Sequence, residues 1–170
     1  SGTITSGTTS GDVSGTSSVG GLVGYQYGAS TINTSTTSGK VTGTSNQVGG
    51  LVGYTYVGNL TINGSTATGN VQGTDKVGGL LGFMDNATSL TIKNSSAQGS
   101  VTGTGTSGQV GGLTGAIYGY AYIYGSNYSG SGVTSSGPSV GGLLGENIYY
   151  DTTIYNSYVN SSGATGVQGT

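Results

Sequence analysis

Several residue types that carry chemistry are missing from this sequence. It has no cysteine, no histidine, no tryptophan and one proline, and only 5% of its 170 residues are charged. Thiolate catalysis, imidazole acid–base catalysis and zinc sites built on these residues are therefore excluded. Three lysines and a net charge of −2 cannot form the basic surface that binds nucleic acid. We expect no cofactor and no metal, and a function that lies in architecture and surface.

Long apolar runs are missing as well. No stretch approaches the roughly 18 consecutive apolar residues of a membrane-spanning helix. No charged segment followed by an apolar one opens the chain, as it would in a signal peptide. The first residue is Ser1 rather than methionine, so we expect a processed product or an excised fragment.

Glycine dominates what is present. It supplies 38 residues, and serine and threonine together make up close to a third of the chain. Such a composition can indicate a disordered linker, and the single proline excludes collagen. However, 32% of the residues are hydrophobic, 13 are tyrosine, and the apolar residues recur at fixed spacing. We therefore expect a folded chain.

One hexapeptide recurs five times. Its first copy, VGGLVG, runs from Val19 to Gly24, and the copies follow one another at offsets of 29, 29, 33 and 30 residues. Two weaker markers keep the same period: a Thr-Ile pair or a variant of it, usually with serine three residues after the isoleucine, and a Gly-x-Val-x-Gly segment. Three ordered markers with one period predict a repeat architecture.

Each repeat holds three short β-branched or aliphatic runs separated by small polar residues. None has helical spacing, and glycine at this density disfavours a helix by roughly 1 kcal/mol per residue. A hairpin turn at Asn63-Gly64 is available in one copy only. We therefore predict an all-β fold, a parallel β-solenoid with three short strands per coil of ~30 residues. It should have about six coils, no helices and a single domain over residues 1–170.

Like residues should stack on like residues in successive coils, which supplies a core that no single coil can form. The two glycines of the hexapeptide allow a bend that turns the valine before them and the leucine after them inward. The recurrent serine should bond within a ladder or to the backbone. The predicted stacking core is Ile4, Val13, Val19, Leu22, Ile32, Val41, Val48, Leu51, Ile62, Val71, Val77, Leu80, Ile92, Val101, Val110, Leu113, Ile123, Val133, Val140, Leu143, Ile154 and Val167.

The block Gly-Gly-Leu-Val-Gly, repeated every 30 residues or so, resembles the GLUG motif. The resemblance extends through five copies, with Thr114 in place of valine or leucine in the fourth. This family occurs in large surface-exposed bacterial and archaeal proteins, including non-catalytic parts of immunoglobulin-A-specific metallopeptidases and adhesin-like proteins. The resemblance implies an extracellular or cell-surface setting and a spacer or adhesive role, and it brings no catalytic residues.

Neither end of the chain shows the polar cap that open solenoids normally need. The chain opens at Thr3-Ile4 and closes at residues 166–170, where the next hexapeptide would begin. We expect subunits to stack end to end into a filament through a head-to-tail contact that does not close. Six coils spaced ~4.8 Å apart give a subunit repeat of roughly 29 Å. The alternative is a segment excised from a longer solenoid.

Tyrosines cluster after the hexapeptides, and Phe83 holds that place in the third copy. Tyrosines two apart lie on one face of a strand, so stacked coils should form an aromatic ladder. Such a ladder can bind surface glycans or contact neighbouring filaments, or it can simply stiffen the coils. The candidate contact residues are Tyr25, Tyr27, Tyr54, Tyr56, Tyr118, Tyr120, Tyr149 and Tyr150.

The acidic residues do not suggest an enzyme. They look like solvated loop charges rather than the paired carboxylates of a glycosidase or a calcium-binding array. They are Asp12, Asp75, Asp85, Glu146 and Asp151. An ice-binding solenoid is a minor alternative, because Thr31, Thr61 and Thr91 stack in register, although regular Thr-x-Thr rows do not persist.

Asn-x-Ser/Thr sequons occur in modest excess over chance and would fit a glycosylated extracellular protein. They begin at Asn33, Asn59, Asn63, Asn86, Asn94, Asn127 and Asn160. Taken together, the sequence predicts a non-enzymatic structural protein, the self-assembling subunit of an extracellular filament. The alternative is a spacer or a segment of a large cell-surface adhesin that binds carbohydrate or mediates cell adhesion.

Overall fold

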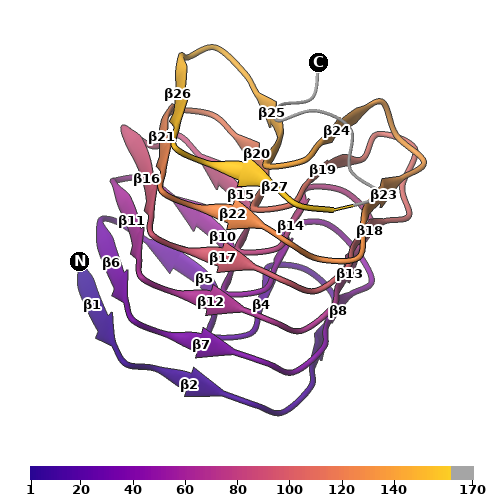
Figure 1. Cartoon of the computed structure of the whole chain (residues 1–170), viewed down its shortest axis with the longest axis horizontal. Coiled ribbons are helices and arrows are strands. Elements are labelled where there is room, and N and C mark those ends of the chain that lie inside the picture. The colour runs from indigo at the N-terminus through magenta and orange to yellow at the C-terminus, as the bar shows by residue number, and fades with distance from the viewer. Residues whose placement is uncertain (162–170) are drawn as a thin grey trace.

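The computed structural model describes residues 1–161, which wind through successive coils stacked along one axis (Figure 1). Strands β1 to β27 form five sheets that run along the stack, and neighbouring strands within each sheet come from successive coils. The pairings are parallel, as between β1 and β6 or β10 and β15. The described residues contain no helix, and accordingly none that could cross a membrane. The predicted all-β parallel solenoid is confirmed.

One coil contains five short strands, not the three that we predicted. In the first coil these are β1 (Gly2–Thr5), β2 (Thr8–Thr9), β3 (Val13–Gly15), β4 (Val19–Gly20) and β5 (Val23–Tyr27). The hexapeptide is not one strand, because the chain bends after its first glycine and the two halves join different sheets. A separate two-residue strand also follows the isoleucine run. Strands of two residues are too short to show an alternating hydrophobic pattern, so the sequence did not reveal them.

The later coils repeat this order. The second holds β6 (Ser30–Asn33), β7 (Thr36–Thr37), β8 (Val41–Gly43), β9 (Val48–Gly49) and β10 (Val52–Tyr56). The third holds β11 (Leu60–Asn63), β12 (Thr66–Ala67), β13 (Val71–Gly73), β14 (Val77–Gly78) and β15 (Leu81–Asp85). The fourth holds β16 (Ser89–Lys93), β17 (Ser96–Ala97), β18 (Val101–Gly103), β19 (Gln109–Gly111) and β20 (Thr114–Ile117). The fifth holds β21 (Tyr120–Tyr124), β22 (Asn127–Tyr128), β23 (Val133–Ser135), β24 (Ser139–Gly141) and β25 (Leu144–Asn147).

A sixth coil is present only in part, as β26 (Thr152–Tyr155) and β27 (Tyr158–Val159). The described residues thus form five complete coils and the beginning of another, rather than the six that we expected. Val167, which we placed in the stacking core, lies outside the described residues.

Identical residues meet in register from coil to coil. The isoleucine row of the β1 sheet joins Ile4, Ile32, Ile62, Ile92, Ile123 and Ile154. The β3 sheet aligns Val13, Val41, Val71, Val101 and Val133. The β4 sheet aligns Val19, Val48, Val77, Val110 and Val140. This register follows from the period, since only parallel coils of nearly equal length superimpose every marker at once.

The glycines after the first valine let the hexapeptides of successive coils stack closely. Val48 and Leu51, which flank the Gly-Gly pair, are both fully buried. A Cβ on Gly49 would lie only 2.0 Å from the Val52 carbonyl oxygen, so no larger residue fits. Backbone bonds between successive leucines connect the bends; one is the 3.0 Å bond from Leu22 N–H to the Leu51 carbonyl. This row contains Leu22, Leu51, Leu80, Leu113 and Leu143.

The recurrent serine forms an internal ladder. The Ser65 hydroxyl accepts the Ser35 backbone N–H at 3.1 Å and donates to the Asn63 carbonyl of its own coil at 3.1 Å. The same two bonds recur at the next steps, which link Ser95 and Ser126. Ser35, Ser65 and Ser126 are fully buried. A satisfied buried hydroxyl in each of the second to fifth coils keeps the corner between two sheets in register. Gly7 holds this position in the first coil, and its N–H donates to the Ser35 hydroxyl.

The core also includes residues that our prediction did not name. Leu60, Leu90 and Met84 are fully buried, and so is Tyr128. Tyr128 aligns with Ala97 of the coil before it. Its hydroxyl donates to the Gly132 carbonyl at 2.6 Å, which satisfies the one polar atom of this large side chain. The core therefore fills the solenoid interior through its middle coils.

The first coil is less buried than the coils that follow. Ile32 and Val41 are each 1% exposed, whereas their equivalents Ile4 and Val13 are only partly buried. Ile154 of the incomplete coil is also only partly buried. Apolar rows that are sealed in the middle of the stack are thus open toward the ends of the described structure.

Candidate binding surface

One row of five aromatic rings runs along the solenoid through all five complete coils. We call it the aromatic row: Tyr25, Tyr54, Phe83, Tyr118 and Tyr149. Successive ring centroids are 5.3, 5.4, 4.9 and 5.8 Å apart. These separations lie within the range in which aromatic pairs attract.

The row changes its position within the repeat halfway along. Tyr25, Tyr54 and Phe83 are register partners on β5, β10 and β15. Phe83 pairs in register with Ala116, yet its ring contacts Tyr118, which follows β20. The aromatic row therefore continues from Phe83 to Tyr118 through a contact between rings that are not register partners.

Further tyrosines pair beside this row. Tyr27 lies 6.1 Å from Tyr56, and Tyr120 lies 5.0 Å from Tyr150, between ring centroids. Among the eight candidate contact residues, Tyr54, Tyr56 and Tyr118 are partly buried, and the others are exposed. Tyr124 and Tyr155, which we did not name, stack at 5.7 Å. The candidate residues thus form a row with flanking pairs.

A groove of about 320 Å³ opens beside the aromatic row. Its lining residues are Tyr56, Asp85, Asn86, Ala87, Tyr118, Tyr149 and Tyr150. Four phenol rings supply apolar faces and hydroxyls, and the carboxylate and amide add hydrogen-bonding groups at one place. Concave sites with aromatic walls and a few convergent polar groups are typical of small-ligand binding. Nothing in the sequence pattern placed Asp85 and Asn86 at this groove, because Asp85 was interpreted as a solvated loop charge and Asn86 only as the start of a sequon.

Two tyrosines of the aromatic row have raised pKa values. The Tyr54 hydroxyl donates to Asp85 Oδ2 at 3.3 Å. Burial, followed by the negative charge of Asp85, raises the pKa of Tyr54 to about 12. Burial, followed by the charge of Glu146, also raises the pKa of Tyr118. Both phenols keep their protons well above neutral pH, and the Tyr54 hydroxyl already donates its hydrogen to Asp85.

A single cation sits against the middle of the row. Lys76 Nζ lies 4.0 Å from the Phe83 ring centroid and 5.7 Å from that of Tyr118. A cation over an aromatic face is attracted by the ring quadrupole. This contact helps to hold Phe83, which is 3% exposed, beneath the surface.

The acidic residues are dispersed. Asp12 accepts the Lys40 backbone N–H at 2.8 Å, and Glu146 accepts a bond from the Gln109 side chain. Asp75 keeps one buried oxygen without a partner. Asp151 is exposed. Within residues 1–161 no three acidic side chains gather into a group that could hold a metal ion.

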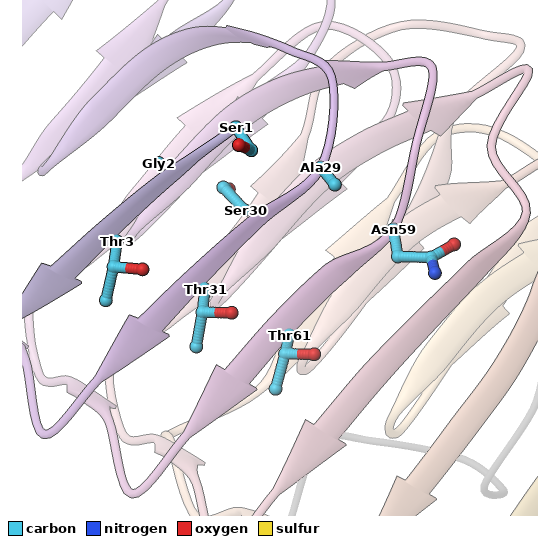
Figure 2. Close-up of a pocket in the computed structure, with 8 residues that line it drawn as sticks. All are labelled: Ser1, Gly2, Thr3, Ala29, Ser30, Thr31, Asn59 and Thr61. Carbon is cyan, nitrogen blue, oxygen red and sulfur yellow. The ribbon is translucent and has the colours of Figure 1, made fainter.

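Threonines form one row on the outer side of the β1 sheet. Thr3, Thr31 and Thr61 lie side by side and line a shallow hollow of about 380 Å³ near the N-terminus (Figure 2). Thr91 continues the row, and Tyr122 interrupts it. The row two residues further along the same face is mixed: Thr5, Asn33, Asn63, Lys93, Tyr124 and Tyr155. The face lacks the paired threonine rows that the ice-binding alternative requires.

The sequons occupy different environments. Asn59, Asn86, Asn94 and Asn160 are exposed, whereas Asn33, Asn63 and Asn127 are partly buried. In the sequons of Asn33 and Asn63 the third residue is a serine of the buried ladder. The fold therefore accounts for part of the excess of sequons, and glycosylation stays a prediction.

Comparison with known proteins found a match to one motif model. Residues 15–42 match the model of the GLUG motif, a stretch that extends from the end of β3 to the middle of β8. Searches among curated proteins and among solved structures found no match to the chain. The matched stretch contains the first hexapeptide and the turn that leads into the second coil. The resemblance that the hexapeptide suggested is thus confirmed: residues 15–42 carry a GLUG motif, set in a parallel β-solenoid of about five turns.

Proposed function

We propose that this protein is a non-enzymatic structural repeat protein of the cell surface or extracellular space, whose solenoids stack end to end into filaments. The GLUG motif and the stacked coils fit a structural or surface repeat protein. We propose the filament as the specific assembly in which the protein carries out this structural role. In this filament each chain binds a second copy of itself.

The open outer face of the first coil carries the proposal. Strand β1 pairs with β6 on one side and has no strand on its other side within residues 1–161. Ile4, Val13 and Leu22 are partly buried there, although their equivalents one coil further on are sealed. An edge with free backbone groups and exposed apolar rows is a template for pairing with another chain. Within residues 1–161 the isoleucine row runs to Ile154 at the opposite end of the stack, so a second copy presents matching chemistry there.

Electron microscopy and sedimentation of the purified chain test this proposal. We expect unbranched fibres one solenoid wide, with a subunit repeat of roughly 29 Å, because each subunit contributes six strands to the β1 sheet at strand spacing. Sedimentation should show growth with protein concentration. Discrete rods of monomer mass at every concentration would overturn the filament and leave the chain as part of a longer surface protein.

A second function is favoured by the groove beside the aromatic row. Its tyrosine walls, together with Asp85 and Asn86, suit a polyhydroxylated ligand such as a surface glycan. In that case the chain is a ligand-binding segment of an adhesin. A glycan array probed with the wild type and with Tyr149→Ala tests this: loss of binding in the variant supports the adhesin, and no binding by the wild type rejects it.

A further inference from the structure

Two exposed tyrosines from successive coils lie ring against ring near the end of the described structure. Tyr120 begins β21, and Tyr150 lies in the loop between β25 and β26. Their ring centroids are 5.0 Å apart with an interplanar angle of 58°. Tyr120 is 42% exposed and Tyr150 48% exposed. Both phenols are therefore open to a reagent in solution and already in contact with each other.

We propose that Tyr120 and Tyr150 are a site of oxidative coupling, at which a dityrosine bond links the fifth coil to the loop that leads into the sixth. The oxidant is hydrogen peroxide acting through a haem peroxidase. Each phenol loses one electron and one proton, and the two phenoxyl radicals join through the ring carbons ortho to their oxygens. The two displaced ring hydrogens move to the oxygens and restore both phenols. Two tyrosines and one peroxide thus give one dityrosine and two waters.

The geometry selects this pair over other tyrosines. Tyr122 lies on the same strand and is 43% exposed, but its register partners are Thr91 and Thr153. Tyr128 is fully buried. A radical on either of these side chains has no exposed phenol across from it.

The other close tyrosine pairs of residues 1–161 are less suited, because their ring centroids are 5.3 to 6.2 Å apart and each pair has at least one partly buried member. These pairs are Tyr25–Tyr54, Tyr27–Tyr56, Tyr54–Tyr56, Tyr118–Tyr149 and Tyr124–Tyr155. The Tyr54 hydroxyl is bonded to Asp85, which ties up one member of the Tyr25–Tyr54 pair. Tyr27 and Tyr56 are further apart, at 6.1 Å.

The loop that carries Tyr150 is held in place. The Asn147 side-chain amide donates to the Tyr150 carbonyl at 3.0 Å and to Thr152 Oγ1 at 2.7 Å. A restrained loop keeps the two rings within reach, which favours coupling inside one molecule over coupling between molecules. The sequence has no cysteine, so this bond would be a covalent tie between coils that disulfides cannot provide here.

The test treats the dilute full chain with a haem peroxidase and less than one equivalent of hydrogen peroxide. Dityrosine fluorescence and an intact mass lower by two hydrogens report coupling, and chymotryptic peptides analysed by mass spectrometry locate it. We expect the first crosslink to join Tyr120 and Tyr150 in monomeric protein. The matched variants are Tyr120→Phe and Tyr122→Phe, which change equally exposed residues of one strand.

Loss of the first crosslink in Tyr120→Phe with its retention in Tyr122→Phe supports the proposal. Equal loss in both variants, a first crosslink at another pair, or crosslinks only between molecules would overturn it. If Tyr120→Phe fails to fold by circular dichroism, Tyr150→Phe in the exposed loop makes the same comparison. The outcome does not depend on filament formation, because it is read on monomers.

Discussion

The backbone N–H of Ser35 points into the next coil and donates to the hydroxyl of Ser65 at 3.1 Å. Both serines are fully buried. This bond satisfies a donor that would otherwise be sealed in the interior without water, and the same arrangement recurs with Ser95 and Ser126 in the next two coils. Stacking in this protein is thus fixed by polar contacts inside the core as well as by apolar rows.

Replacing Ser65 with alanine should destabilise the solenoid. The change leaves the Ser35 N–H buried without an acceptor, at a cost of about 1–3 kcal/mol in the free energy of unfolding. Urea unfolding followed by circular dichroism measures the loss. Thr68→Ala, at an exposed position of the same coil, is the control and should change little. Equal effects at the two positions would contradict the role of the ladder.

Replacing Thr114 with valine should stabilise the protein. The Thr114 side chain is fully buried and its hydroxyl has no hydrogen-bond partner. Its register partners are Leu81 and Leu144, so the position belongs to an apolar row. Removing an unsatisfied buried hydroxyl at nearly constant shape should raise the free energy of unfolding by about 1 kcal/mol.

Thr55→Val is the matched control for that change. Thr55 is equally buried, but its hydroxyl lies 3.5 Å from the Gln26 side-chain oxygen. Thermal melts of both variants and the wild type measure the two effects, and we expect Thr55→Val to gain less stability than Thr114→Val. A larger gain at Thr55 would show that the missing partner is not what makes Thr114 unfavourable.

The solenoid should lose stability at high pH. Burial and nearby carboxylates raise the pKa of Tyr54 to about 12 and also raise the pKa of Tyr118. The folded state therefore holds these protons more tightly than the unfolded state, whose tyrosines ionise near pH 10. Stability is retained below pH ~10 and falls as the pH rises toward about 12.

Ultraviolet titration of phenolate formation, run alongside circular dichroism, measures this effect. A group of phenols that includes Tyr54 and Tyr118 should ionise late, together with loss of structure. Tyr54→Phe should remove one late phenolate. A single titration of all tyrosines near pH 10 with the fold intact would contradict the prediction.

Filament growth should depend on Ile4 but not on its neighbour Thr3. Both lie on β1, and Ile4 continues the isoleucine row while the Thr3 side chain is exposed on the outer side. In Ile4→Asp a charge enters the proposed contact between copies, where it would be buried without a partner. We expect this variant to remain monomeric in sedimentation, whereas Thr3→Asp assembles like the wild type. Fibres from Ile4→Asp would place the contact elsewhere.

The period of the sequence predicts the stacking because residues such as Ile32 and Ile62 superimpose only in parallel coils. It does not predict the number of strands. Strands such as Thr36–Thr37 are two residues long, and backbone bonds between coils define them rather than a hydrophobic pattern. The buried Tyr128 is a further example, because its place depends on a bond to Gly132 that no repeat marker encodes.

The candidate surface was predictable only in outline. Recurrent tyrosines indicate a ladder, but the contact between Phe83 and Tyr118 departs from strand register. Asp85 and Asn86 join the groove because the third coil ends beside the tyrosines of the coils that follow. Such placements depend on how each loop leaves its strand, and loop lengths vary from one repeat to the next.

The serine ladder also gives the molecule a direction. Each amide of the ladder donates to the coil that follows it in sequence, as Ser35 does to Ser65 and Ser65 does to Ser95. The two ends are therefore chemically different, and no two-fold axis can relate copies that continue the ladder. A fibre built in this way would be polar, with one end that adds subunits by their first coil and another that adds them by their last.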